Sequence, residues 1–130
     1  MTDAELIRRA GEVTRPRSLG KTVEAGAVGA AILAGSGAVF CGVSIDAACG
    51  IGFCAEHGAV AAMVTAGESR VLAMVAVHAA GHVVAPCGRC RELVMQIDSG
   101  NAATRVLLPG TRVLPLAQLL PDWWQSESLP

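Results

Sequence analysis

The pattern of apolar and polar positions at the start of the chain predicts a helix. Residues 3–13 carry apolar side chains at roughly helical spacing. Thr2 and Glu5 have the spacing of a capping box, in which each side chain bonds the backbone amide of the other residue. The next segment, residues 15–26, contains Pro16 and two glycines, so we expect a loop there.

Two short apolar runs follow, at residues 27–33 and 39–45. Gly35-Ser36-Gly37 lies between them and is typical of a hairpin turn, because glycine supplies the positive φ angles that such turns need. The pattern therefore predicts two antiparallel strands. Residues 46–53 contain two glycines and are predicted to form a loop.

The second half of the chain alternates between helical and strand-like patterns. The predicted elements are, in chain order, a helix at 54–66, a strand at 71–77, a helix at 87–97, strands at 105–108 and near 112–113, and a short helix near 116–120. A hairpin followed by this alternation implies a mixed sheet with helices on both faces. The predicted fold class is α/β, with a single domain over residues 1–130.

Composition and charge narrow the possible functions. Hydrophobic residues make up 52% of the chain and charged residues 16%, so we expect partner subunits to cover part of the surface. No apolar run reaches the length that spans a membrane. The formal net charge is -1 and aromatic residues are 3% of the chain, which argues against a nucleic-acid partner.

The chain contains five cysteines. Its first residues lack the basic and apolar pattern of a signal peptide, so we expect a cytoplasmic protein. In that reducing compartment, cysteines serve more often as metal ligands or catalytic groups than as disulfides.

Three of the cysteines have the spacing of a catalytic metal site. Cys87 and Cys90 form a C-x-x-C pair, and the best third ligand is Cys54. Cys54 and Cys87 each begin a predicted helix, where free amides and the helix dipole favour thiolate. Three thiolates around zinc leave the fourth tetrahedral position to water, which zinc makes easier to ionise.

Glu56 lies two residues after Cys54, in the first turn of the same predicted helix. A carboxylate there can take a proton from water and deliver it to a ring nitrogen and then to a leaving amine. The alternative is that Glu56 only stabilises the helix dipole. Because it lies next to a predicted zinc ligand, we favour the catalytic role.

Together these motifs resemble those of a known family. Cys54-Ala55-Glu56, followed by Pro86-Cys87-Gly88-Arg89-Cys90, resembles the signature of the cytidine deaminase superfamily. Residues 28–32 and 40–46 resemble the early strand and the substrate loop of tetrameric cytidine deaminases. Residues 86–93 resemble blasticidin-S deaminase especially closely. The resemblance extends from about residue 26 to the tail.

The resemblance implies a three-layer α/β/α fold with a mixed five-stranded sheet, one Zn2+ per subunit, and a homotetramer whose active sites are completed across subunit boundaries. It also implies a small nucleoside or nucleoside-like substrate. The implied substrate contacts are the backbone amide of Ala55 with the base, and Ser44 and Asp46 with the sugar. Arg89 is a candidate either for substrate binding or for steadying the zinc thiolates. Cys54 in place of histidine resembles the branch that contains the free-nucleoside and blasticidin deaminases.

Four positions depart from the family pattern. Gly26 stands where cytidine deaminases usually have a phenylalanine that packs on the substrate. Ser44-x-Asp46 replaces Asn-x-Glu, and His57 replaces an arginine that offsets the thiolate charge. The catalytic centre is therefore kept, while the sugar site is altered.

Three hypotheses follow. The first is a zinc-dependent deaminase of cytidine or deoxycytidine. The second is a deaminase of blasticidin S or of another aminated heterocycle. The third, least favoured, is a non-catalytic protein that zinc only stabilises.

The other notable side chains have less specific interpretations. We expect Cys41 and Cys49 to be small core hydrophobes, and His57 to lie beside the zinc thiolates. Trp123 and Trp124 could stack on a base in a neighbouring subunit or simply pack in an interface.

Overall fold

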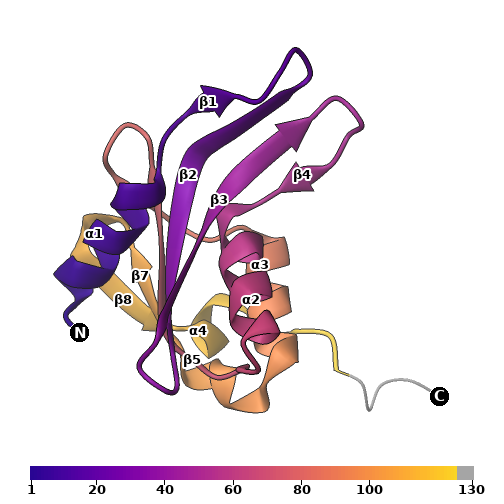
Figure 1. Ribbon diagram of the computed structural model, residues 1–130. Helices are drawn as coiled ribbons and strands as arrows, with labels where there is room; N and C mark the ends of the chain where they lie inside the picture. Colours follow the sequence, from indigo (N-terminus) through magenta and orange to yellow (C-terminus); the bar gives the residue numbers. More distant parts are fainter. Residues whose placement is uncertain (126–130) are drawn as a thin grey trace.

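The computed structural model describes residues 1–125 and contains one mixed sheet with helices on both faces (Figure 1). The helices are α1 (Asp3–Val13), α2 (Ala55–Thr65), α3 (Gly88–Ile97) and α4 (Leu116–Leu119), with 3-10 turns η1 (Ser99–Ala103) and η2 (Pro109–Thr111). The strands are β1 (Arg17–Ser18), β2 (Val23–Ala34), β3 (Val39–Ala47), β4 (Gly52–Phe53), β5 (Val71–His78), β6 (Val83–Val84), β7 (Arg105–Leu108) and β8 (Arg112–Pro115).

The sheet has the order β4-β3-β2-β5-β7-β8, with β1 paired to β2 and β6 paired to β5. Only β5 and β7 run parallel, so the predicted mixed α/β sheet is confirmed. Five strands have four or more residues, namely β2, β3, β5, β7 and β8. The expected five strands correspond to these, while β1, β4 and β6, of two residues each, were not predicted.

Two predicted loops are wrong in part. Within residues 15–26, β1 pairs antiparallel with the beginning of β2, so both segments are strand. Within residues 46–53, β3 continues to Ala47 and β4 pairs with it. These strands depend on backbone pairing between distant segments, which overrides the loop-like composition of each segment alone.

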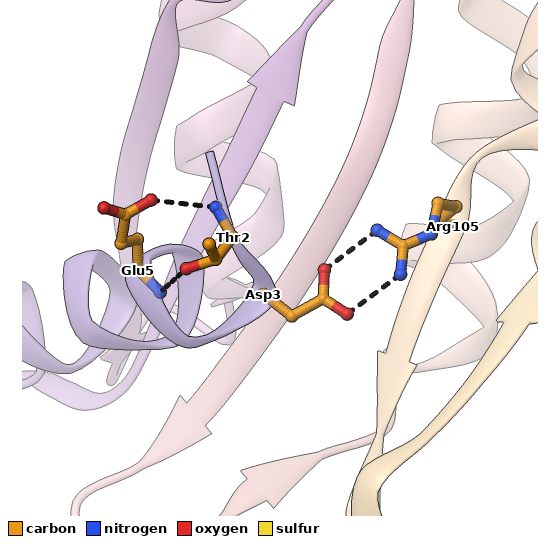
Figure 2. Close-up of polar contacts among 4 residues, drawn as sticks. All are labelled: Thr2, Asp3, Glu5 and Arg105. Atoms are coloured by element: carbon orange, nitrogen blue, oxygen red, sulfur yellow. Dashed lines mark hydrogen bonds and ion pairs between the residues drawn. The ribbon is translucent and has the colours of Figure 1, made fainter.

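Helix α1 is fixed at its N-terminus by two sets of polar contacts (Figure 2). The predicted capping box is present, because the amide of Glu5 donates to Thr2 Oγ1 at 3.2 Å and the amide of Thr2 donates to Glu5 Oε2 at 2.8 Å. The guanidinium of Arg105 on β7 donates to both carboxylate oxygens of Asp3, each at 2.8 Å. Helix α1 is thus held against the sheet at its first turn.

The hydrophobic core has one half on each face of the sheet. Ala31 and Val75 pack with α1 on one face, whereas Ile32 and Met74 pack with α2 and α3 on the other. This division follows from the alternation of side chains along a strand. Helix α1 and the pair α2 and α3 accordingly lie on opposite sides of the sheet in Figure 1.

Helix α2 packs with its backbone directly on β3. A Cβ atom at Gly42 of β3 would lie 2.4 Å from the backbone nitrogen of Ala59 in α2. Gly58 of α2 is similarly close, since a Cβ there would lie 3.3 Å from Cα of Gly42. This close approach fixes the N-terminus of α2 relative to β3. In residues 1–125, no helix is both long and apolar enough to cross a bilayer.

Candidate active site and metal centre

Two helix N-termini carry the three predicted metal ligands. Cys54 is the N-cap of α2 and Cys87 is the N-cap of α3, as the sequence predicted. Cys90 lies in the first turn of α3 and is fully buried. The two helix starts meet, although they are separated by more than thirty residues of sequence.

The three sulfur atoms form a tight cluster. Cys87 Sγ lies 3.4 Å from Cys54 Sγ and 3.3 Å from Cys90 Sγ, and Cys54 Sγ and Cys90 Sγ lie within 4.8 Å of each other. Sulfur ligands around a tetrahedral zinc ion are about 3.8 Å apart, as follows from a Zn–S distance of about 2.3 Å. Donor type and spacing therefore suit one soft, tetrahedral metal ion.

His57 lies beside this cluster, as expected from the sequence. One of its ring nitrogens is within 4.8 Å of the sulfurs of Cys54 and Cys90, so Cys54, His57 and Cys90 form a further group that could hold a metal. However, His57 Nδ1 accepts a hydrogen bond from the backbone amide of Cys54 at 3.2 Å. That bond occupies the Nδ1 lone pair, and Phe53 packs edge-on against the ring at 5.5 Å between centroids. The imidazole is thus fixed next to the thiols.

The thiols differ in how easily they ionise. Burial raises the pKa of Cys90 strongly, and the negative charge of Glu56 raises it further. The pKa of Cys54 is also raised, mainly by burial and then by its contact with Cys87. For Cys87 burial has the same effect, but hydrogen bonds from the backbone and thiol of Cys90 outweigh it and lower the pKa. A bound cation would favour the thiolate form of all three.

Glu56 lies in a pocket of about 230 Å³ that includes Cys54 and Cys87 in its lining. Its side chain is 4% exposed, and its carboxylate lies beside the buried thiol of Cys90. A buried carboxylate that lines a pocket can exchange protons with a molecule bound there.

The same pocket brings together all four predicted substrate residues. Ser44, Asp46, Ala55 and Arg89 line it with Glu56. The sequence did not identify the remaining wall residues, which are Val28, Gly52, Phe53, Val84 and Ala85. Apolar residues in a pocket wall have the same sequence pattern as core residues, so no local signal distinguishes them.

Arg89 contacts the metal-ligand cluster directly. Its Nη2 donates to Cys54 Sγ at 3.4 Å, and the Cys54 sulfur in turn raises the pKa of Arg89. In the family pattern an arginine at the position of His57 supplies a positive charge beside the thiolates. Here Arg89 of α3 places a positive charge beside Cys54 instead. The two alternatives left open for Arg89 are compatible, because it contacts the cluster and also lines the pocket.

Several other side chains can now be placed. Cys41 is half-buried against the core on the α1 side, as predicted. Cys49 is exposed, so its prediction as a core residue is wrong, because it lies in the turn between β3 and β4. Trp123 packs against the core beside α3, and Trp124 is 51% exposed.

A larger cavity, of about 740 Å³, lies elsewhere. It is bounded by α1, β6 and the β7–β8 hairpin. None of the clustered cysteines nor Glu56 lines it, although it shares Val84 and Ala85 with the smaller pocket. The reactive side chains thus select the smaller pocket as the candidate active site.

Neither protein-family models nor curated proteins gave a match to the chain. Solved structures did. Cytidine deaminase from Mycobacterium tuberculosis matches with a TM-score of 0.80 and 28% identity, over 96% of this chain and 99% of that one. The Burkholderia pseudomallei cytidine deaminase matches with a TM-score of 0.77 and 28% identity, over 95% and 100%. The Mycobacterium leprae cytidine deaminase matches with a TM-score of 0.77 and 26% identity, over 94% of this chain and 100% of that one.

This chain belongs to the cytidine deaminase superfamily. Its α/β architecture is the cytidine deaminase fold, over almost the full length of the matched structures. The cytidine deaminase neighbours support a deaminase enzyme, and the Cys-His-Cys group could bind a metal.

Proposed function

We propose that this protein is a zinc-dependent aminohydrolase that converts cytidine or deoxycytidine to the uracil counterpart with release of ammonia. The observation that carries the proposal is a cluster of three thiols, two of which line one pocket together with the buried carboxylate of Glu56. The matched cytidine deaminases support a small nucleoside as the substrate.

In this proposal Cys54, Cys87 and Cys90 hold the zinc ion, and His57 lies against them without being required as a ligand. Three thiolate ligands leave one tetrahedral position open, the arrangement of catalytic rather than structural zinc sites. Bound zinc would supply Lewis acidity, which makes a water molecule easier to deprotonate near neutral pH.

Glu56 performs the proton transfers. It takes a proton from the attacking water and gives it to the ring nitrogen N3, while the water oxygen bonds to C4. It then moves the second water proton to the exocyclic amine. The C4–N bond breaks, ammonia leaves, a carbonyl remains at C4, and Glu56 returns to the carboxylate.

The rest of the pocket orients the substrate. The backbone amide of Ala55, which lies at the N-terminus of α2 and lines the pocket, would donate to the base carbonyl. Ser44 and Asp46, which also line the pocket, would contact the sugar, and Arg89 faces both the pocket and the Cys54 sulfur. These assignments follow the family motif residue by residue.

One observation favours a second candidate, deamination of blasticidin S or of another aminated heterocycle. Gly26 has a φ of 84°, and a Cβ atom there would lie 1.9 Å from the carbonyl oxygen of Arg15. The phenylalanine usual at this position is therefore excluded by the backbone itself. The contact that this phenylalanine makes with the substrate in cytidine deaminases would then be missing here.

We further infer a homotetramer in the cytoplasm. Helix α2 is apolar around its whole circumference, and Val64 is 50% exposed on it, as expected of a helix that packs in an interface. All five cysteines, which lie within the described residues, are free thiols, as expected in a reducing compartment.

The proposal is tested with purified, zinc-loaded protein by measuring ammonia release from cytidine, deoxycytidine and blasticidin S. Glu56→Gln should retain its zinc and lose activity by roughly 10²–10⁴-fold, the usual contribution of a general acid–base group. Turnover of blasticidin S alone would support the second candidate. Zinc binding without turnover of any aminated heterocycle would favour the non-catalytic hypothesis.

A further inference from the structure

A bulge in β2 lies directly beside the candidate active site. Ala25 pairs with Ile45, and Gly29 pairs with Val43, so the register between β2 and β3 shifts between these two pairs. Residues 26–28 of β2 therefore lie opposite a single residue of β3, Ser44. Such a bulge leaves backbone groups that the ladder cannot pair.

Tertiary contacts fix each of the three bulge residues. Gly26 adopts a φ of 84° and packs so closely on the Arg15 carbonyl that no side chain fits. The carbonyl of Ala27 accepts a hydrogen bond from the amide of Ala79 at 2.9 Å. The amide of Val28 donates to the hydroxyl oxygen of Ser44 at 3.0 Å. The Ser44 side chain thus replaces a backbone partner that β3 cannot supply.

The bulge separates two compartments of one groove. Val28 and Ser44 line the pocket that contains Glu56. Ala27 and Ser44 line an adjoining pocket of about 290 Å³, and Asp46 lines both. The position of residues 26–28 therefore determines the shape of the wall against which the sugar end of a substrate would lie.

We propose that Ser44 is a positioning residue, which sets the shape of the substrate pocket by holding the β2 bulge through its hydrogen bond to Val28. The role in substrate binding rests on the proposed function, whereas the hold on the bulge does not. A part-buried amide that loses its acceptor is costly. Without the Ser44 hydroxyl, Val28 is expected to move until its amide finds water or another acceptor.

This role differs from direct contact with a sugar hydroxyl, which the motif resemblance implies for Ser44. The two roles make different predictions for a substrate without those hydroxyls. A sugar contact affects only substrates that carry the contacted hydroxyl. A displaced pocket wall affects every substrate that fills the pocket.

The experiment compares wild type with Ser44→Thr and Ser44→Val. Threonine and valine side chains have nearly the same shape, but only threonine has a hydroxyl group. Amide hydrogen exchange at Val28 is measured by NMR, and KM and kcat are measured for cytidine and 2′,3′-dideoxycytidine. Zinc content and circular dichroism confirm that each variant is folded. Ser44→Ala replaces the valine variant if valine prevents folding.

We expect exchange at Val28 to be about tenfold faster in Ser44→Val and close to wild type in Ser44→Thr, because only threonine keeps the acceptor. We expect KM to rise about tenfold for both substrates in Ser44→Val, with kcat within about twofold of wild type. In Ser44→Thr, KM should stay close to the wild-type value for both substrates.

Two results would overturn the proposal. One is unchanged exchange at Val28 in Ser44→Val. The other is a rise in KM for cytidine alone, which would make Ser44 a sugar contact. If wild type turns over neither substrate, the proposed deamination of cytidine fails separately, and the exchange rates alone then support or overturn the hold of Ser44 on the bulge.

Discussion

Arg89 of α3 donates a hydrogen bond to the sulfur of Cys54 at the N-terminus of α2, at 3.4 Å. This contact joins the two helices that carry the metal-ligand cluster. It also places a guanidinium charge beside thiols that must be thiolates to bind a metal. The local sequence around each residue does not show that the two are in contact.

Replacing Arg89 tests the importance of that charge. Arg89→Met should lower kcat/KM and zinc retention several-fold, a modest effect because solvent screens an exposed charge. Arg89→Lys should recover part of the loss, since it keeps the charge without the planar donor geometry. Steady-state kinetics and zinc analysis measure the effect. Wild-type values in the methionine variant would show that Arg89 has no electrostatic role.

Removing one metal ligand should abolish zinc binding. Cys90 is buried in the cluster, so Cys90→Ser should lose most of the bound zinc and unfold at a lower temperature. A ligand at a thousandfold excess over its Kd stabilises the folded state by about 4 kcal/mol. The control is Cys49→Ser, because Cys49 is exposed and does not line the pocket. Elemental analysis and thermal unfolding test both variants, and full zinc occupancy in Cys90→Ser would contradict the ligand assignment.

Alanine substitutions at two glycines should have opposite effects on stability, because only one of the two, Gly42, lies where α2 packs closely on β3. A Cβ atom at Gly42 would lie 2.4 Å from backbone of α2, so Gly42→Ala should destabilise the protein by about 2 kcal/mol or more. It should also weaken zinc retention, because α2 begins at Cys54. A Cβ atom at Gly11 of α1 would meet no other atom within 4 Å, so Gly11→Ala should stabilise by about 0.5 kcal/mol. Urea unfolding measures both, and equal effects would contradict the packing.

The ion pair between Asp3 and Arg105 predicts a pH-dependent contribution to stability. Hydrogen bonding to Arg105 lowers the pKa of Asp3 below its ordinary value of 3.8, against a smaller opposing effect of burial. The contribution is therefore complete above the pKa of the unfolded chain and is lost as pH falls through the lower folded pKa. Because both side chains are largely exposed, Asp3→Asn should cost only about 0.5 kcal/mol at pH 7.

The measurement is urea unfolding of wild type and Asp3→Asn across a pH series. The difference between them should begin to shrink as the pH falls below about 4, where Asp3 becomes protonated in the unfolded chain, and should vanish below the lower pKa of the folded protein. A difference that grows on acidification would have the wrong sign.

The exposed apolar side of α2 predicts assembly. Val64 is 50% exposed on a helix that is apolar all round, so Val64→Asp should dissociate the expected tetramer into smaller species. Leu19→Asp is a matched control, because Leu19 is 57% exposed in the turn between β1 and β2. Light scattering after size exclusion gives the mass of each. A wild-type monomer at micromolar concentration would reject the assembly.

Most of the secondary structure could be predicted because helices and long strands have a local signature. The capping box at Thr2, and helices beginning at Cys54 and Cys87, follow from spacing within a few residues. The two-residue strands β1, β4 and β6 have no such signature, since each exists only through pairing with a longer strand. Cys49 was wrongly predicted as a core residue although its segment was predicted as a loop, because cysteine is usually a buried residue and here it is exposed in a turn.

The sequence by itself predicted a set of reactive residues, and the structure brings them together at one site. Cys54 with Glu56, and Cys87 with Cys90, could be predicted because each pair lies within a few residues of sequence and has side chains of distinctive chemistry. Only the tertiary structure decided how the set is completed. Contacts such as Arg89 with Cys54, and Ser44 with Val28, join residues far apart in the chain. They depend on strand register and on how closely a helix approaches a sheet, which are set by packing of the whole fold and not by neighbouring residues.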